Sequence, residues 1–357
     1  MEKTMAKGKA AVMRAALTGL HRTGAGRLLA PFTQGQGLIF MLHRVKPETG
    51  VPREFAPNRI LEVSPEFLGD VLDQVLEAGL DIVTLDEAAE RLTHGEGGRF
   101  ACFTFDDGYR DNKEYALPLF QARNVPFTLY IPTAYPSGHG ELWWVALEEA
   151  IDRAPDEVSI DRDGDTWRLP TGTDADKIRT YEKIYWWLRA LPEETMRAKI
   201  RELAERHGVD LSKQCRDLIM TWDELRDMAS DPLVTMGAHT KDHLALAKLP
   251  EKEALAQIVE SADRIEAELG ERPVHFAYPY GDPGSAGPRD FALTEGAGFR
   301  TAVTTRKGML FPAHKDHLTA LPRVSLNGEF QDLSYTALYL TGAPFAIWNG
   351  FQQVDAA

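Results

Sequence analysis

The sequence predicts an α/β protein built on a mostly parallel sheet, and three observations support this. Short apolar runs of strand length alternate with stretches of helical periodicity, at the spacing of βα units. Residues that cap or stop helices stand between these stretches. The 357 residues, 43% of them hydrophobic, are enough for one large α/β barrel with insertions or for two ordinary domains.

The first βα units lie before residue 134. The run GLIFMLHRV is expected to form a buried strand that ends at His43. Ser64, followed by a proline and a glutamate, is an N-cap, and Gly79 stops the helix that it begins. Asp86 is expected to cap the next helix. A further helix is expected at residues 115–121, and the strands at 37–45, 81–85, 99–105 and 126–132.

The alternation is interrupted between about residue 134 and residue 219, which predicts an insertion over residues 134–218. The insertion is expected to contain a hairpin over residues 158–169 that turns at Asp163-Gly164, followed by a long helical stretch. After the insertion, a helix is expected to begin at Trp222 and another to end at Gly270. The remaining strands are expected at residues 233–237, 274–278, 301–305 and 321–326.

Charge and cysteine content narrow the classes of partner. The formal net charge of −14 argues against nucleic acid as the main partner. The two cysteines, Cys102 and Cys215, have neither the spacing of a metal knuckle nor that of a disulfide framework, so a reducing compartment is expected. No apolar run approaches the roughly 20 residues that span a bilayer. These features predict a cytoplasmic protein.

The first 35 residues form a separate basic segment. Lysines and arginines outnumber acids here, and Arg14 and His21 interrupt the apolar stretches, so we expect no secretory signal peptide. The segment is expected to be helical, either resting on an anionic membrane surface or packed across the outside of the fold. The expected organisation is thus a basic segment at 1–35, a main domain at 36–340 with its insertion, and a C-terminal tail at 341–357.

Two adjacent carboxylates, Asp106 and Asp107, follow the strand that ends in FACFTF. Like charges at this separation repel each other, so one carboxyl group is driven toward its protonated form unless a cation lies nearby. A solvated turn is the simpler explanation of the pair. The alternative is that another part of the chain brings a cation to it.

The segment GAHTKDH supplies residues that can hold such a cation. His239 and His243 are four positions apart, so on a helical turn their imidazoles lie on one face. Two histidines and one carboxylate leave positions open on a divalent metal, as in catalytic sites. The alternative is a solvated helix face. Both this pair and the aspartates stand where a strand gives way to a loop, which favours a shared metal site.

These segments resemble a known family. Residues 104–108 (TFDDG) resemble the TFDDG motif of the polysaccharide deacetylases, the NodB-homology or carbohydrate esterase 4 family. Residues 239–243 (HTKDH) resemble the family's H-[ST]-x-x-H motif, and residues 276–281 (FAYPYG) its third motif. The resemblance covers about residues 36–330. It implies a distorted (β/α) barrel of about seven strands, here with a helical and hairpin insertion.

The resemblance also implies roles for individual residues. Asp106 is the general base, and Asp107, His239 and His243 bind a divalent metal. Zinc suits this ligand set, and Co²⁺, Ni²⁺ or Mn²⁺ also accept it. A water activated by the metal attacks an acetyl carbonyl, and the backbone N–H of Tyr280 helps to stabilise the oxyanion. The implied activity is hydrolysis of a carbon–nitrogen bond that is not a peptide bond.

Three later positions depart from the family pattern. Ala277 stands where the third motif has an arginine that orients the base, and AVTTRKG (residues 302–308) lacks the usual Asp-Trp pair. Arg323, in LPRV, stands where the fifth motif supplies a histidine. Poly-N-acetylglucosamine deacetylases show similar substitutions, together with a histidine on the first strand. By this likeness His43 is a candidate acid or substrate contact, or else a core histidine bonded to backbone. Arg323 either replaces the missing orienting charge or forms a surface ion pair.

Several aromatic residues of the insertion also have two interpretations. Aromatic faces stack on sugar rings, which suits a carbohydrate enzyme, but packing in the core is the ordinary role of these side chains. Adjacent tryptophans on a helix point in different directions, so at most one of each pair faces a cleft. The residues concerned are Trp143, Trp144, Tyr185, Trp186 and Trp187.

The resemblance leaves three functional hypotheses. The first is a metal-dependent deacetylase acting on an N-acetylglucosamine-type polysaccharide, oligosaccharide or glycolipid, with peripheral membrane contact through the basic N-terminus as an option. The second keeps the site but acts on small or cyclic amides, with the insertion deciding the substrate. The third is a catalytically inactive carbohydrate-binding relic, because the third-motif arginine and the Asp-Trp pair are missing.

Overall fold

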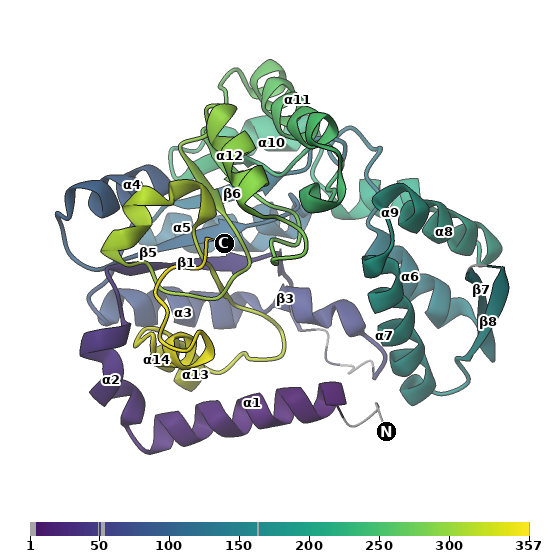
Figure 1. The fold of residues 1–357 in the computed structure, drawn as a ribbon, viewed down its shortest axis with the longest axis horizontal. Helices are drawn as coiled ribbons and strands as arrows, with labels where there is room; N and C mark the ends of the chain where they lie inside the picture. The colour runs from purple at the N-terminus through teal and green to yellow at the C-terminus, as the bar shows by residue number, and fades with distance from the viewer. Residues whose placement is uncertain (1–4, 49, 51–53, 163, 357) are drawn as a thin grey trace.

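A curled parallel sheet forms the centre of the molecule (Figure 1). The computed structural model describes residues 5–48, 50, 54–162 and 164–356, and for residues 5–12 it describes the backbone alone. The strand order is β11-β10-β9-β6-β5-β1-β12, with β4 also paired to β5, and every pairing in this sheet is parallel. The bounds are β1 Gly37–Leu42, β4 Asp81–Ile82, β5 Phe100–Phe105, β6 Phe127–Ile131, β9 Val234–Ala238, β10 His275–Ala277, β11 Thr301–Val303 and β12 Val324–Ser325.

The two ends of the sheet meet at one parallel bridge between Val303 and Leu321, where the N–H of Thr304 donates to the carbonyl of Leu321 at 2.9 Å. The sheet therefore closes into a distorted (β/α) barrel, as the family resemblance implied. The central strands β1 and β5 are buried along their whole length, which explains their unbroken apolar sequences.

Helices cover the outside of the barrel, and their boundaries follow local capping. The Oγ of Ser64 accepts a hydrogen bond from the N–H of Phe67, as expected for an N-cap. The expected cap at Asp86 is wrong: Thr84 caps that helix, and Asp86 lies in its first turn beside Arg300. The bounds are α3 Pro65–Glu77, α4 Leu85–His94, α5 Leu117–Arg123, α10 Trp222–Ala229, α11 Glu251–Leu269 and α12 Pro288–Gly296.

Short elements connect these units. A two-stranded sheet, β2 with β3, follows β1, and a π-helical turn precedes α5 where the sequence predicted one helix. Both cysteines are free and buried. The bounds are β2 Arg44–Val45, β3 Glu62–Val63, the π turn Asn112–Ala116, and 3₁₀ turns at Pro57–Leu61, Leu246–Lys248, Pro312–Asp316 and Leu318–Ala320.

The insertion packs as a second layer of helices beside the barrel, at the right of Figure 1. It has its own hydrophobic core, which includes Trp143, Leu147 and Ile184. The expected hairpin is present as β7 and β8, and Asp163 of its turn lies outside the described residues. The bounds are α6 Trp143–Arg153, β7 Glu157–Arg162, β8 Asp165–Pro170, α7 Asp174–Ala190, α8 Glu193–Arg206 and α9 Leu211–Leu218.

The two terminal segments lie together along one side of the barrel (Figure 1). Helix α1 packs on α13 through the buried side chain of Leu17, and α2 packs on α14. The residues 341–357, expected to be a tail, contain α14. None of the described helices is both long and apolar enough to cross a membrane. The bounds are α1 Met5–Arg22, α2 Ala25–Thr33, α13 Leu333–Tyr339 and α14 Ala343–Trp348.

Candidate active site

The two motifs meet at one edge of the barrel. Strand β5 ends at Phe105 and delivers Asp106 and Asp107, and β9 ends at Ala238 and delivers His239. These strands are both neighbours of β6 and run parallel to it, so their carboxyl ends share an edge. In α/β barrels this edge carries the active site.

Asp107, His239 and His243 form a compact buried cluster. The Oδ1 of Asp107 lies 3.3 Å from Nε2 of His243 and 3.7 Å from Nε2 of His239. One ligand atom from each of the three residues lies within 4.8 Å of the other two. Such spacing suits three donor atoms that share one ion.

The histidines do not lie on a helical turn, so that expectation is wrong. The segment after β9 is a loop, and Thr240 and His243 adopt left-handed backbone conformations with φ of 63° and 57°. Asp107 and Tyr280, at 74° and 62°, share this unfavourable conformation for residues other than glycine. Four of the six such residues in the described chain therefore lie at this site, where tertiary contacts hold backbone strain.

The three side chains fit a divalent cation. His239 Nδ1 lies 2.7 Å from the carbonyl of Ala277 and donates to it, so Nε2 keeps its lone pair for a ligand. Asp107 Oδ1 is buried, and among the described residues it has no hydrogen-bond partner. An orphaned carboxylate oxygen that faces two imidazoles is the donor set that a cation would satisfy.

Electrostatics support the same conclusion. Burial raises the pKa of Asp107 well above its usual value, and the neighbouring Asp106 raises it further. Burial also lowers the pKa of both His239 and His243. A divalent cation reverses the effect on the aspartate, because it stabilises an ionised carboxylate together with neutral imidazoles.

Asp106 has a different environment, because Arg323 pairs with it. The guanidinium donates from Nη1 to Oδ1 and from Nη2 to Oδ2, each at 2.7 Å. Burial favours a higher pKa for Asp106, but Arg323 and the nearby histidines outweigh it and lower the pKa to about 2. The negative charge of Asp106 is thus balanced by Arg323, separately from Asp107, which faces the two histidines. Asp106 is therefore ionised at neutral pH.

The alternative that Arg323 forms a surface ion pair is wrong. Its side chain is 1% exposed, and its Nε donates to the carbonyl of Thr304 at 2.8 Å. A carboxylate with a depressed folded-state pKa stabilises the fold above its unfolded pKa of about 3.9. Acidification from about pH 4 toward pH 2 protonates Asp106 and removes this contribution.

Replacing Arg323 with leucine is expected to lower the free energy of unfolding by about 3–5 kcal/mol, because Asp106 is left buried and unpaired. Denaturant titration at neutral pH measures this. An Arg323→Lys variant keeps the charge but loses the paired hydrogen bonds, so an intermediate value is expected. A leucine variant as stable as the wild type would contradict a structural role for the pair.

His43 lies directly after β1, and its Nε2 is 4.0 Å from Oδ2 of Asp106. Its side chain is 21% exposed, so it is partly accessible at the edge of the site. Burial lowers its pKa to about 4, despite the attraction of Asp106. The imidazole is therefore neutral at neutral pH.

Tyr280 lies next to His243, with ring centroids 4.9 Å apart. Its hydroxyl accepts a hydrogen bond from Nε1 of Trp143 at 2.7 Å. Among the described residues, no acceptor bonds to the backbone N–H of Tyr280. That donor is therefore available to a ligand.

The insertion contributes contacts that sequence reasoning missed. The guanidinium of Arg189, on α7, lies 3.7 Å from the ring centroid of Tyr280. Arg197, on α8, donates to the carbonyls of Asp242 and His243 at 2.7 and 3.2 Å. Single arginines on a helix carry no sequence signal for this role, because the contact depends on how the insertion packs against the barrel.

The tryptophans at the start of α6 are buried but also reach the site. The ring of Trp144 lies 5.2 Å from that of His243, while Trp143 bonds to Tyr280. On α7, Trp186 is 68% exposed and Trp187 is half-buried. The core packing expected as the ordinary role is confirmed for the first pair, and both rings also contact residues of the site.

The contacts of Arg197 predict a role in holding His243. An Arg197→Met variant is expected to bind a divalent cation about 10–100-fold more weakly, the usual cost of losing a residue that orients a metal ligand. Isothermal titration of the protein with Zn²⁺ measures this directly. Arg201→Met is the matched control, because Arg201 lies on the same helix and shares the partner Glu141, but it bonds to Glu194 instead of the His243 loop. Equal effects of both variants would contradict the prediction.

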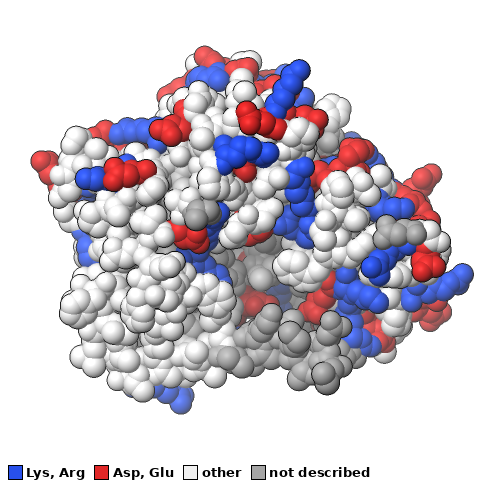
Figure 2. Space-filling model, viewed as in Figure 1, with Lys and Arg blue, Asp and Glu red and all other residues white. Residues whose placement is uncertain are grey.

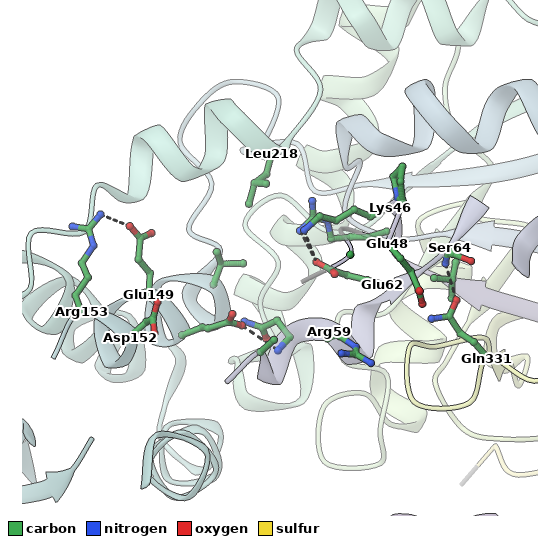
Figure 3. Close-up of a pocket in the computed structure, with 18 residues that line it drawn as sticks. Lys46, Glu48, Arg59, Glu62, Ser64, Glu149, Asp152, Arg153, Leu218 and Gln331 are labelled. Atoms are coloured by element: carbon green, nitrogen blue, oxygen red, sulfur yellow. Dashed lines mark hydrogen bonds and ion pairs between the residues drawn. The ribbon is translucent and has the colours of Figure 1, made fainter. Parts of the chain in front are cut away.

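A large cavity with many charged side chains lies elsewhere on the molecule. It has a volume of about 750 Å³ and lies between the β2–β3 region and helix α6 of the insertion (Figure 3). Charged side chains of both signs line it, among them Arg44, Glu62 and Glu149. Arg44 is paired there with Glu62, and none of the candidate site residues described above lines this cavity.

Comparison with known proteins identifies the family. Residues 94–287, more than half of the chain, match the family model described as polysaccharide deacetylase. The chain belongs to the polysaccharide deacetylase family. This deacetylase is accordingly a hydrolase of carbon–nitrogen bonds other than peptide bonds. A search of curated proteins finds no match to it.

Solved structures share the fold of this deacetylase at low sequence identity. The deacetylase PplD of Streptococcus pyogenes, in complex with acetate, is 15% identical with a TM-score of 0.54, covering 85% of this chain and 96% of its own. IcaB from Ammonifex degensii is 17% identical with a TM-score of 0.52, covering 86% and 97%. A de-N-acetylase from Aggregatibacter actinomycetemcomitans is 13% identical with a TM-score of 0.52, covering 85% and 99%.

Proposed function

We propose that this polysaccharide deacetylase removes N-acetyl groups from an N-acetylglucosamine-type polysaccharide, oligosaccharide or glycolipid, and that the reaction depends on a divalent cation. The proposal rests on the different environments of two adjacent carboxylates. Asp106 is ion-paired and ionised, whereas Asp107 faces two histidines with an unsatisfied oxygen. A base beside a set of metal-binding donors is what hydrolysis of an unactivated amide requires.

Asp107, His239 and His243 would hold the cation. When bound, a cation there supplies Lewis-acid polarisation of the amide carbonyl and a lower pKa for a nearby water. Zinc matches a set of two imidazoles and one carboxylate, and Co²⁺, Ni²⁺ and Mn²⁺ are accepted by the same donors.

Asp106 takes the proton from the attacking water in this scheme and returns it to the amine nitrogen as the C–N bond breaks. Its low pKa means that it is always ionised near neutrality, and the two hydrogen bonds from Arg323 hold its plane in one orientation. Arg323 thereby supplies the orienting charge that Ala277 does not. The N–H of Tyr280 donates to the oxyanion that develops on the acetyl carbonyl.

We assign to His43 a role in binding the substrate. An imidazole with a pKa of about 4 is neutral at pH 7 and is a poor proton reservoir, but its N–H donates well to a sugar hydroxyl or amide.

Acetate release tests the proposal. The protein loaded with Zn²⁺ is incubated with N-acetylglucosamine oligomers of increasing length, and in parallel with cyclic amides. Release that increases with oligomer length supports a saccharide substrate. Turnover of the cyclic amides alone would overturn the substrate assignment. A bound cation without turnover of either set would favour the binding relic.

A further inference from the structure

Helices α2 and α14 present a cluster of exposed apolar side chains. Leu28 and Phe32 are 78% and 79% exposed, and they lie one turn apart on the same face of α2. Ile347 and Trp348 on α14 are 47% and 60% exposed, and Phe351 directly after it is 63% exposed. Helix α2 packs against α14, and Phe32 and Phe351 line one small groove between them, so the exposed apolar side chains of this helix pair are here called the α2–α14 patch.

The helices that carry and surround this patch have no acidic residue. None of α1, α2, α13 and α14 contains an aspartate or glutamate, although the chain has 54 of them. Figure 2 shows the corresponding surface, at the lower left, as almost uniformly white. The exposed Arg22 ends α1 just before α2, the exposed Arg27 stands next to Leu28 in α2, and the ammonium group of Lys307 lies 4.4 Å from the ring centroid of Trp348.

The position of the patch separates it from catalysis. Only residues 34–36 separate α2 from the first residue of β1, so the patch lies at the amino end of the barrel strands. The candidate active site lies at their carboxyl ends. A large partner bound to the patch therefore does not cover the candidate active site.

We propose that the α2–α14 patch docks this deacetylase on an anionic lipid bilayer. Exposed tryptophan, phenylalanine and leucine side chains enter the boundary between head groups and acyl chains, and the surrounding arginines pair with anionic head groups. A second copy of the chain fits the patch less well. A symmetric dimer through it brings the basic borders of both copies together and sets like charges against each other.

Vesicle sedimentation of the full-length protein tests the proposal. One set of vesicles contains phosphatidylcholine alone, and the other an equal mixture of phosphatidylcholine and phosphatidylglycerol. The protein is expected to bind the mixed vesicles and to be released by salt, since screening weakens surface electrostatics. A double variant, Phe32→Ser with Trp348→Ser, is expected to bind at least about tenfold more weakly. Replacing Arg22 and Arg27 by glutamine is expected to weaken binding about fivefold for each charge.

Trp186→Ser is the matched control, because this tryptophan is comparably exposed but lies on α7 of the insertion. It is expected to leave vesicle binding unchanged. All variants are first shown to keep the wild-type unfolding midpoint and to release acetate at the wild-type rate. Three results would overturn the proposal: no binding to mixed vesicles, equal weakening by Trp186→Ser, or self-association in solution that the double variant abolishes while no vesicle binding is seen.

Discussion

An Asp106→Asn variant is expected to deacetylate N-acetylglucosamine oligomers about 10²–10⁴-fold more slowly than the wild type, the usual contribution of a positioned general base. Asparagine has nearly the shape of aspartate and keeps one acceptor oxygen for Arg323, but it cannot take a proton from water. The loss is expected in kcat, measured as acetate release at saturating substrate. The cation content is expected to stay at the wild-type level, because Asp106 is not among the three clustered donors.

Stability needs its own control in this experiment. The Asp106→Asn substitution leaves the buried guanidinium of Arg323 without a counter-charge, and breaking a buried pair costs about 3–5 kcal/mol. A double variant, Asp106→Asn with Arg323→Met, removes both charges and is expected to recover most of that stability. It is not expected to recover activity. Recovery of both would show that Asp106 acts through the fold alone, and the assignment as base would fail.

Removing the divalent cation is expected to abolish acetate release, and restoring it is expected to bring activity back. The physical reason is that a cation at this cluster is needed to polarise the amide carbonyl. Among the described residues, Oδ1 of Asp107 faces the two imidazoles and has no hydrogen-bond partner. Chelation followed by titration with Zn²⁺ measures this, with metal content determined alongside activity. Full activity in protein shown to be free of metal would exclude the proposed reaction.

The ligand assignment is tested by binding instead of turnover. Asp107→Asn and His243→Ala are expected to lower cation affinity by more than about 100-fold, because losing a residue that only orients a ligand already costs roughly 10–100-fold. Asp242→Asn is the control, since this carboxylate lies in the same loop but accepts a hydrogen bond from Gln257. An unchanged affinity in Asp107→Asn would remove that residue from the site.

The strands and helices could be predicted from sequence patterns, whereas the barrel that they build was implied by the family resemblance. Periodicity and capping are local properties, because they depend on backbone dihedrals and on side chains a few residues apart. The buried strands β1 and β5 and the start of α3 at Ser64 therefore fall where they were expected. The cap at Asp86 failed for a related reason: Thr84 competes for the same helix end two residues earlier, and its hydroxyl has the geometry to accept from Glu87.

The pairing of His239 with His243 shows the limit of a local pattern. Spacing of four residues predicts a shared helix face, yet the two rings meet through a loop with left-handed residues. The motif indicated that both side chains lie close together, but it did not indicate the backbone conformation of the loop that places them there. That backbone is strained, and strain of this kind persists only where surrounding contacts hold it.

The sequence alone determined the order of the motifs, the alternation of strands and helices, and the residue types that can hold a cation. Only the tertiary structure decided that Arg323 pairs with Asp106, that Arg197 of the insertion donates to the carbonyl of His243, and that α2 packs against α14. Each of these joins segments far apart in the chain. Such contacts form when the barrel closes and the insertion packs, which no pattern in neighbouring residues encodes.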